Sequence, residues 1–182
     1  MAYIGKALSE DQYRSFFSDN VHKAFKEFID DQKKYKKFMK FRKENYVKYF
    51  RPKLFPGIPD FLQKLKNKYK LAIASSGNKN SILKILENQK IDMLFQTILA
   101  TTEPTKENVI KEILRETNSS PEEAVIISDT TGDISMAKRM GLKTIGVTWG
   151  FHSASTLHAA HPDFIANSLQ ELQSLITKNG NN

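Results

Sequence analysis

The sequence predicts an α/β fold, with a doubly wound parallel sheet that follows a separate helical region. Beyond Pro52, short β-branched apolar runs alternate with helical patterns, as in parallel sheets whose strands are joined by helices. Before Pro52 no segment predicts a strand. A chain of 182 residues with 40% hydrophobic content can bury one sizeable core and a small appended subdomain.

The region before Pro52 predicts helices. From Ser9 to about Phe50, apolar side chains recur three and four positions apart, which is the spacing of one helix face. Ser9 followed by Gln12 is a capping-box pattern, so we expect a helix to begin there. The residues that carry the spacing are Phe16, Phe17, Val21, Phe25, Phe28, Ile29, Phe38, Phe41, Tyr46, Tyr49 and Phe50.

A cluster of turn residues separates this region from the rest of the chain. Pro52, Pro56, Gly57 and Pro59 lie close together, and such residues favour breaks between elements. We therefore expect a helical subdomain over residues 1–53 and an α/β core over residues 54–182.

Each element of the core is expected from a local pattern. The run 70–75 is an apolar strand that breaks into small hydroxyl residues, and the β-branched run 125–128 predicts a buried strand. Further strands are expected at 97–100 and 144–147, with a short edge strand at 163–166. Helices are expected at 61–67, 80–89, 106–116, 134–140 and 169–176, the fourth of them ended by Gly141.

Composition narrows the cellular setting. The chain has no cysteine, which excludes disulfides and thiolate chemistry and suits a reducing compartment. Its start has no apolar core like that of a signal peptide, and no window approaches the length of a membrane span. We therefore expect a cytoplasmic protein without a membrane partner.

Two carboxylates follow the strand expected at 125–128. Asp129 comes directly after it, and Asp133 lies four residues later, before the helix expected at 134–140. Carboxylate oxygens suit hard cations such as Mg²⁺, and ligands of doubly wound sheets bind at the carboxyl ends of strands. The alternative is structural, with Asp129 in a turn and Asp133 capping the helix.

Two further segments could hold a phosphate. Ser75, Ser76 and Gly77 end the first core strand, where a hydroxyl and backbone N–H groups can bind phosphate oxygens. Lys106 opens a helix, where the positive end of the dipole disfavours a cation, and an anionic ligand would explain its position. A polar turn and a chance lysine are the alternatives for each segment taken alone.

The order of these segments resembles the haloacid dehalogenase superfamily, in its phosphoglycolate phosphatase-like branch. Ser75 matches the second family motif, Lys106 the third, and Asp129 with Asp133 the fourth. The segments 54–62 and 146–150, with 160–165, resemble the return from cap to core and the family's closing segment.

The resemblance implies a fold, a cofactor and roles. It implies a Rossmann-like core with a small helical cap, a Mg²⁺ cofactor and hydrolysis of a small phosphorylated metabolite. Ser75 and Lys106 would be the catalytic residues that neutralise the phosphoryl oxygens, with Ser76 and Gly77 completing the phosphate site. Asp129 and Asp133 would hold the metal.

The family's first motif, Asp-x-Asp at the end of the first strand, has no match in this chain. The early aspartates Asp11, Asp19, Asp30 and Asp31 all lie in helical, polar surroundings. Ser128 also stands where the family usually has glycine, and Lys106 lacks the usual flanking prolines. The resemblance therefore implies that the nucleophile and the first central strand are missing. We expect a shortened, inactive form of an enzyme, since buried unpaired backbone groups would cost a native chain about 1–3 kcal/mol each.

Two other functions remain open. The chain could be a pseudoenzyme that binds a phosphorylated ligand or partner without hydrolysis, or a basic nucleic-acid-binding protein. The nucleic-acid-binding alternative rests on the stretch Lys33–Lys43, which contains seven basic residues, and on the formal net charge of the chain, which is +8. We favour an amphipathic helix with a solvated face for this stretch and do not expect nucleic acid as the partner.

Two smaller expectations concern assembly and the histidines. Exposed strand edges make a homodimer a further expectation. His152, His158 and His161 are expected at the surface or in loops.

Overall fold

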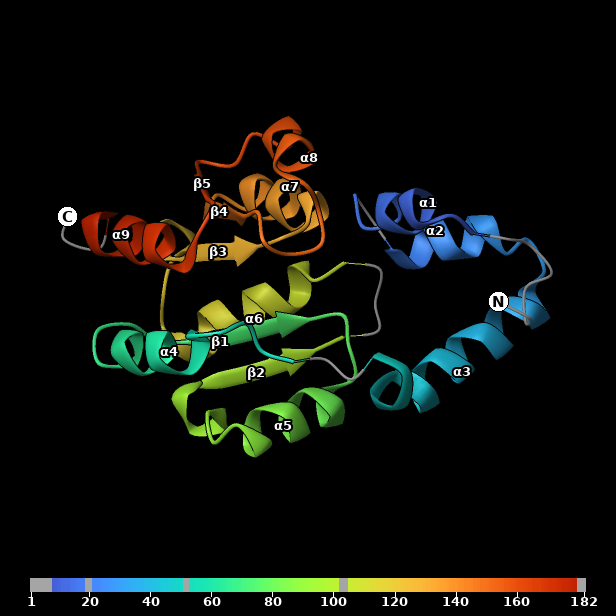
Figure 1. Ribbon diagram of the computed structural model, residues 1–182, viewed down its shortest axis with the longest axis horizontal. Helices are drawn as coiled ribbons and strands as arrows, with labels where there is room; N and C mark the ends of the chain where they lie inside the picture. The colour runs from blue at the N-terminus through green and yellow to red at the C-terminus, as the bar shows by residue number, and fades with distance from the viewer. Residues whose placement is uncertain (1–7, 19–20, 51–52, 102–104, 180–182) are drawn as a thin grey trace. The chain divides into compact units, whose positions relative to one another are not determined.

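The computed structural model describes residues 8–18, 21–50, 53–101 and 105–179, without the side chains of residues 42–43 and 46–50. It divides into two compact units, one of residues 1–16 with 20–106 and one of residues 17–19 with 107–182. Figure 1 traces the elements in chain order. No helix in the described part of the chain is long and apolar enough to cross a membrane.

The first unit begins with three helices, α1 (Glu10–Ser15), α2 (Val21–Phe28) and α3 (Gln32–Phe50). The expected capping box is confirmed, because the Ser9 hydroxyl accepts the Gln12 N–H at 3.1 Å and the Gln12 side chain accepts the Ser9 N–H. Phe25 is fully buried and meets Phe16 edge to face, with ring centroids 5.0 Å apart. Tyr46, Tyr49 and Phe50 also belong to the predicted apolar pattern, but their side chains lie outside the described part of the structure.

The basic stretch lies on α3 and has two faces. Phe38 is buried in the aromatic cluster around Phe25, with Tyr35 and Met39 packed against it. The lysines at 33, 34, 36, 37 and 40 are exposed. This division supports the interpretation of an amphipathic helix with a solvated face, for the side chains that the structure describes.

The remainder of the first unit is α/β. It contains α4 (Ile58–Lys66), β1 (Ala72–Ser75), α5 (Lys79–Asn88), the 3-10 helix η1 (Asp92–Leu94) and β2 (Thr97–Ala100). Strands β1 and β2 are parallel, and Ser75 pairs with Ala100 at their carboxyl ends. Helix α4 begins before the expected residue 61, because Gly57 adopts a positive φ of 80° as its N-cap and Pro59 is tolerated in the first turn.

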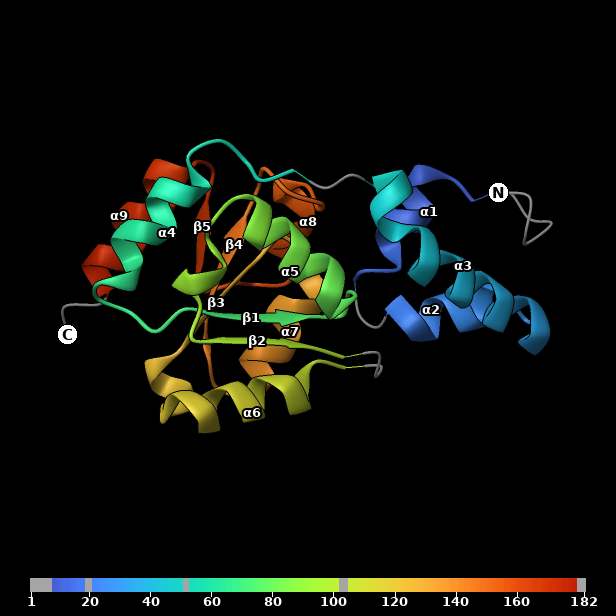
Figure 2. The same ribbon diagram turned by 90° about the horizontal axis from the view of Figure 1, so that it is seen from below.

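The second unit holds a three-stranded parallel sheet in the order β3-β4-β5. Helix α7 packs against β3 and β4, and α9 packs against β5, which Figure 2 shows beside it. Ile134, Thr144 and Leu157 are fully buried in this unit. In chain order the elements are α6 (Glu107–Thr117), η2 (Pro121–Glu123), β3 (Val125–Ser128), α7 (Thr131–Arg139), β4 (Lys143–Val147), α8 (Ala154–Ala159), β5 (Phe164–Ala166) and α9 (Leu169–Asn179).

The predicted fold class is confirmed, since the described strands all pair in parallel and helices connect them. Two details differ. Helix α8 was not expected, although Ser153 caps it by accepting the Thr156 N–H. Helix α7 begins at Thr131 rather than at 134, so Asp133 lies in its first turn and Thr130 is the N-cap.

Strand β3 is less buried than its sequence predicts. Val125 and Ile127 are 44% and 41% exposed, because in the described part of its unit β3 pairs only with β4 and forms the edge of the sheet. A β-branched run predicts a strand but does not reveal its place in the sheet. That a first central strand is missing stays a prediction.

Asp163 and Thr144 form a reciprocal contact between the residue that precedes β5 and strand β4. The Asp163 carboxylate accepts the Thr144 hydroxyl at 2.6 Å and the Thr144 N–H at 2.8 Å, while the Thr144 hydroxyl accepts the Asp163 N–H. The hydrogen bond from the Thr144 hydroxyl is the main cause that lowers the pKa of Asp163 from its ordinary value of 3.8. The ionised carboxylate therefore stabilises the fold above that value, and the stabilisation is lost as the pH falls through the lowered pKa.

We expect Asp163→Asn to reduce the free energy of unfolding at neutral pH and to have little effect in acid. The amide keeps an acceptor but loses the charge, so the difference from wild type should shrink as the pH falls below 3.8. Urea unfolding across this range measures it. Glu87→Gln, at an exposed position of α5, is the control, and an Asp163→Asn effect that is constant with pH would contradict the prediction.

Candidate functional site

The backbone after β4 holds Asp129 in place at the carboxyl end of β3. Its Oδ2 accepts the Phe151 N–H at 2.8 Å, and its carbonyl oxygen accepts the His152 N–H at 3.0 Å. Gly150 comes so close that an added Cβ would lie 2.2 Å from the Asp129 Cβ. The segment 150–152 thus fixes both the backbone and the carboxylate of Asp129.

Ser128 connects the end of β3 to Asp133 across residues 129–133, which we call the aspartate loop. Its hydroxyl donates to Asp133 Oδ2 at 2.9 Å and accepts the Thr130 N–H at 3.2 Å. Asp133 lies in the first turn of α7, where the helix dipole favours a negative charge. A glycine at position 128 could make neither contact, so the serine found here orients Asp133 through its side chain.

The residues of this loop fit a Mg²⁺ ion. Mg²⁺ in proteins is bound through one or two carboxylates together with water and substrate phosphates, and Asp129 and Asp133 supply two carboxylates from one loop. Among the described residues, no group of three or more histidine, aspartate or glutamate side chains is placed to hold a metal ion. If a cation were bound by both carboxylates, water and substrate would have to complete its coordination shell.

The predicted phosphate segment lies in the first unit. Ser75 ends β1, and its Oγ accepts the Gly77 N–H at 3.0 Å. A hydroxyl that accepts one bond still carries a proton to donate. Ser76 and Gly77 then lead to Asn78, which caps α5 by accepting the Ser81 N–H. The turn is thus built by its own hydrogen bonds and places a hydroxyl and backbone N–H groups beyond the strand.

Lys106 lies directly before α6 and is half-buried. It follows β2, the strand whose last residue pairs with Ser75, while Glu103 and Pro104 before it lie outside the described residues. The structure thus describes Ser75, Ser76, Gly77 and Lys106 in one unit, and Asp129 and Asp133 in the other. Within each unit, the predicted site residues lie at or just beyond the end of a strand, or at the beginning of a helix.

Sequence reasoning missed three contributors to the aspartate loop. His152 lies in a loop, one of the two expected places, but it is only 4% exposed, and its Nδ1 accepts the Thr131 N–H at 3.1 Å. Phe17 packs on Phe151 with ring centroids 4.6 Å apart, and its carbonyl oxygen accepts the Gly132 N–H. Gly150 is the third. The only signal in the sequence is that Gly-Phe-His follows a strand, as ligand-binding loops often do.

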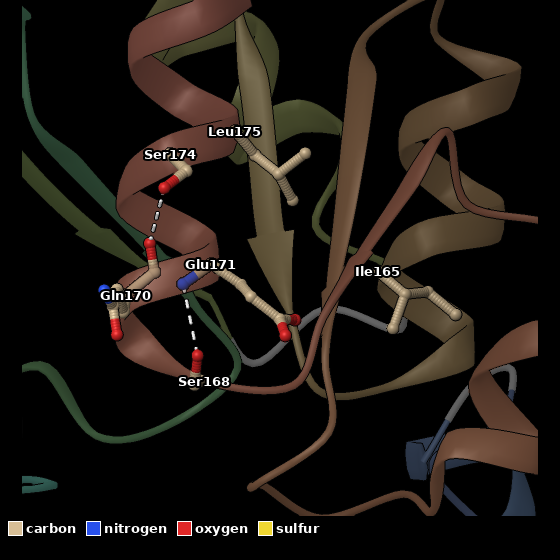
Figure 3. A pocket seen from close by; sticks show the side chains of 6 residues that line it. All are labelled: Ile165, Ser168, Gln170, Glu171, Ser174 and Leu175. Atoms are coloured by element: carbon tan, nitrogen blue, oxygen red, sulfur yellow. Dashed lines mark hydrogen bonds between the residues drawn. The ribbon is translucent and has the colours of Figure 1, made fainter.

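A groove elsewhere in the second unit holds none of the predicted site residues. It has a volume of about 470 Å³ and lies between β5 and α9 (Figure 3). Its polar groups bond to one another, since Ser168 accepts the Glu171 N–H and Ser174 donates to the Gln170 carbonyl. Its lining residues are Ile165, Ser168, Gln170, Glu171, Ser174 and Leu175.

Comparison with known proteins identifies relatives over most of the chain. A family model described as haloacid dehalogenase-like hydrolase matches residues 2–147. A phosphoglycolate phosphatase of Aquifex aeolicus is 32% identical over 192 aligned positions, which cover 95% of this chain and 86% of that protein. A phosphoglycolate phosphatase of Synechococcus elongatus is 30% identical over 127 positions, 69% of this chain, and the match spans only 60% of that relative's length.

A solved structure agrees with these relatives in fold. The crystal structure of a predicted phosphatase from Clostridium acetobutylicum superposes with a TM-score of 0.81 and 27% sequence identity. The match covers 95% of this chain and 84% of that one.

Proposed function

Since the chain belongs to the haloacid dehalogenase-like hydrolase family, we propose that its site is that of a Mg²⁺-dependent phosphomonoester hydrolase similar to the phosphoglycolate phosphatases. One observation carries the proposal. Asp129 lies at the carboxyl end of β3 with its carboxylate oriented by the Phe151 N–H, at the edge where ligands of parallel α/β sheets bind.

The proposed roles follow from the chemistry of each group. Ser75 donates its hydroxyl and Ser76 offers its backbone N–H to the phosphoryl oxygens, while the Gly77 N–H donates to Ser75 Oγ and orients that hydroxyl. Lys106 balances their negative charge. Asp129 and Asp133 hold Mg²⁺, which when bound neutralises charge on the transferred phosphoryl group. The substrate class is a small phosphorylated metabolite, and the helical subdomain over residues 1–53 is proposed as the cap of a core over residues 54–182.

The carboxylate of one early aspartate, Asp31, is engaged in backbone hydrogen bonds. Asp31 Oδ1 accepts the N–H groups of Lys33 and Lys34, at 2.8 and 3.0 Å, and these bonds lower its pKa. Its carboxylate therefore acts as a helix cap at the start of α3. Asp11 lies in the first turn of α1, and Asp19 lies outside the described residues. We therefore expect the 182 residues printed here to bind phosphorylated ligands and to hydrolyse them negligibly.

Ligand binding tests the phosphate site. We expect Ser75→Ala and Lys106→Met each to weaken binding of 2-phosphoglycolate by about tenfold or more, because each removes a hydrogen bond or ion pair to a charged oxygen. Isothermal titration calorimetry in the presence of Mg²⁺ measures the affinity. Lys111→Met, at an exposed position of α6, is the matched control.

Two results would revise the proposal. Equal binding by wild type and both variants would remove Ser75 and Lys106 from the site. Mg²⁺-dependent phosphate release that disappears in Asp129→Asn would show that the printed chain has a nucleophile of its own.

A further inference from the structure

A buried histidine contacts the loop that carries Asp129 and Asp133. His152 is 4% exposed, and its Nδ1 lies 3.1 Å from the Thr131 backbone nitrogen, which donates its hydrogen to it. The backbone N–H of the same residue donates to the Asp129 carbonyl at 3.0 Å. One residue therefore holds the loop at two points, one on each side of Thr130.

These two bonds fix the path of the backbone between the carboxylates. The Asp129 carbonyl and the Thr131 N–H bracket the peptide units that turn the chain from β3 into α7. If the Thr131 N–H lost its acceptor, it would be left unsatisfied at a residue only 7% exposed, and the loop would have to move to find another partner. The position of Asp133, two residues further on, depends on this turn.

We infer that His152 is a positioning residue for the divalent-cation site, and that it acts by accepting the Thr131 N–H through Nδ1. This inference rests on the proposed function, since it concerns the same two carboxylates. His152 itself donates no ligand. Its contribution is to hold Asp129 and Asp133 in the relative orientation in which one cation can bind both.

Two polar substitutions separate this role from simple filling of the core. In His152→Asn the side-chain carbonyl oxygen can take the place of Nδ1, whereas in His152→Gln the polar group reaches the place of Nε2 and the acceptor for Thr131 is lost. Both variants keep a polar side chain of moderate size at this position. His158→Asn, at an exposed position of α8, is the control.

The readout is the dissociation constant for Mn²⁺, measured by electron paramagnetic resonance on the folded protein, with Tm recorded for each variant. We expect His152→Gln to bind Mn²⁺ about tenfold more weakly than wild type, as for other residues that orient metal ligands. His152→Asn and His158→Asn should remain within about threefold of wild type. A residue that only fills space would change Tm and leave the dissociation constant of the folded protein unaltered.

Three results would overturn the inference. Mn²⁺ affinity equal to wild type in His152→Gln would show that the contact does not position the site, and equal weakening in both variants would show that the Nδ1 acceptor is not the cause. Absence of a through-hydrogen-bond NMR coupling between the Thr131 nitrogen and His152 Nδ1 in wild type would remove the contact itself, whether or not the variants fold. If Mn²⁺ binds equally to wild type and Asp129→Asn, the proposed metal site fails as well, which distinguishes that failure from a failure confined to His152.

Discussion

Replacing Gly150 with alanine is expected to destabilise the second unit and to abolish its affinity for divalent cations. The new Cβ would lie 2.2 Å from both the Cβ and the Oδ2 of Asp129. Rotating the Asp129 side chain cannot relieve the contact with its Cβ, so the backbone at the end of β3 must shift. The φ of Gly150 lies outside the left-handed range that only glycine adopts readily, so the effect arises from lack of space.

We expect a loss of about 1–3 kcal/mol in the free energy of unfolding, as for other overpacked sites. Urea unfolding measures it, and titration with Mn²⁺ measures the loss of binding. Gly146→Ala is the control, because its added Cβ would meet atoms no closer than 3.6 Å, an ordinary contact distance. If the two variants behave alike, the close approach of residue 150 to Asp129 is not required.

Asp129→Asn is expected to reduce affinity for Mn²⁺ or Mg²⁺ by at least about tenfold while leaving the fold intact. The substitution removes the negative charge that attracts a hard cation. In the wild type, the Phe151 nitrogen lies 2.8 Å from Asp129 Oδ2. The asparagine Oδ1 can still accept this N–H, so the hydrogen bond that holds the loop is kept. Loss of binding without loss of stability is the distinguishing result.

Calorimetric titration with each cation, combined with urea unfolding, checks both halves of this prediction. Glu122→Gln removes one negative charge from an exposed residue of the same unit and serves as the charge-matched control. Unchanged cation affinity in Asp129→Asn would contradict the assignment of Asp129 to the metal site.

Local pattern was sufficient to predict most of the secondary structure and the places of several candidate residues. The β-branched runs at 97–100 and 125–128 form β2 and β3 with the same bounds, and Ser75 and Asp129 fall at the strand ends where they were expected. These features depend on residues close together in sequence. The start of α7 was misplaced by three residues because Thr130, Thr131 and Gly132 do not themselves signal a helix.

The contacts that orient the aspartate loop could not be predicted from local sequence pattern. Phe151 and Asp129 are 22 positions apart, and only the folded sheet brings them together. The burial of His152 and the exposure of Val125 and Ile127 likewise follow from where strands and loops lie in three dimensions. Sequence periodicity gives one face of an element but not the neighbour that this face meets.

The pairing of β3 with β4 has a consequence for the conformational entropy of the aspartate loop. Closing a flexible chain of 22 residues has an entropic cost that grows with its length. Because Ser128 is already paired with Gly146 in the parallel ladder, only the short segment after Gly146 must be ordered to bring Phe151 to Asp129. The loop therefore acquires its order at little additional entropic cost once the strands have paired, and opening of this ladder would release the loop in the same cooperative step.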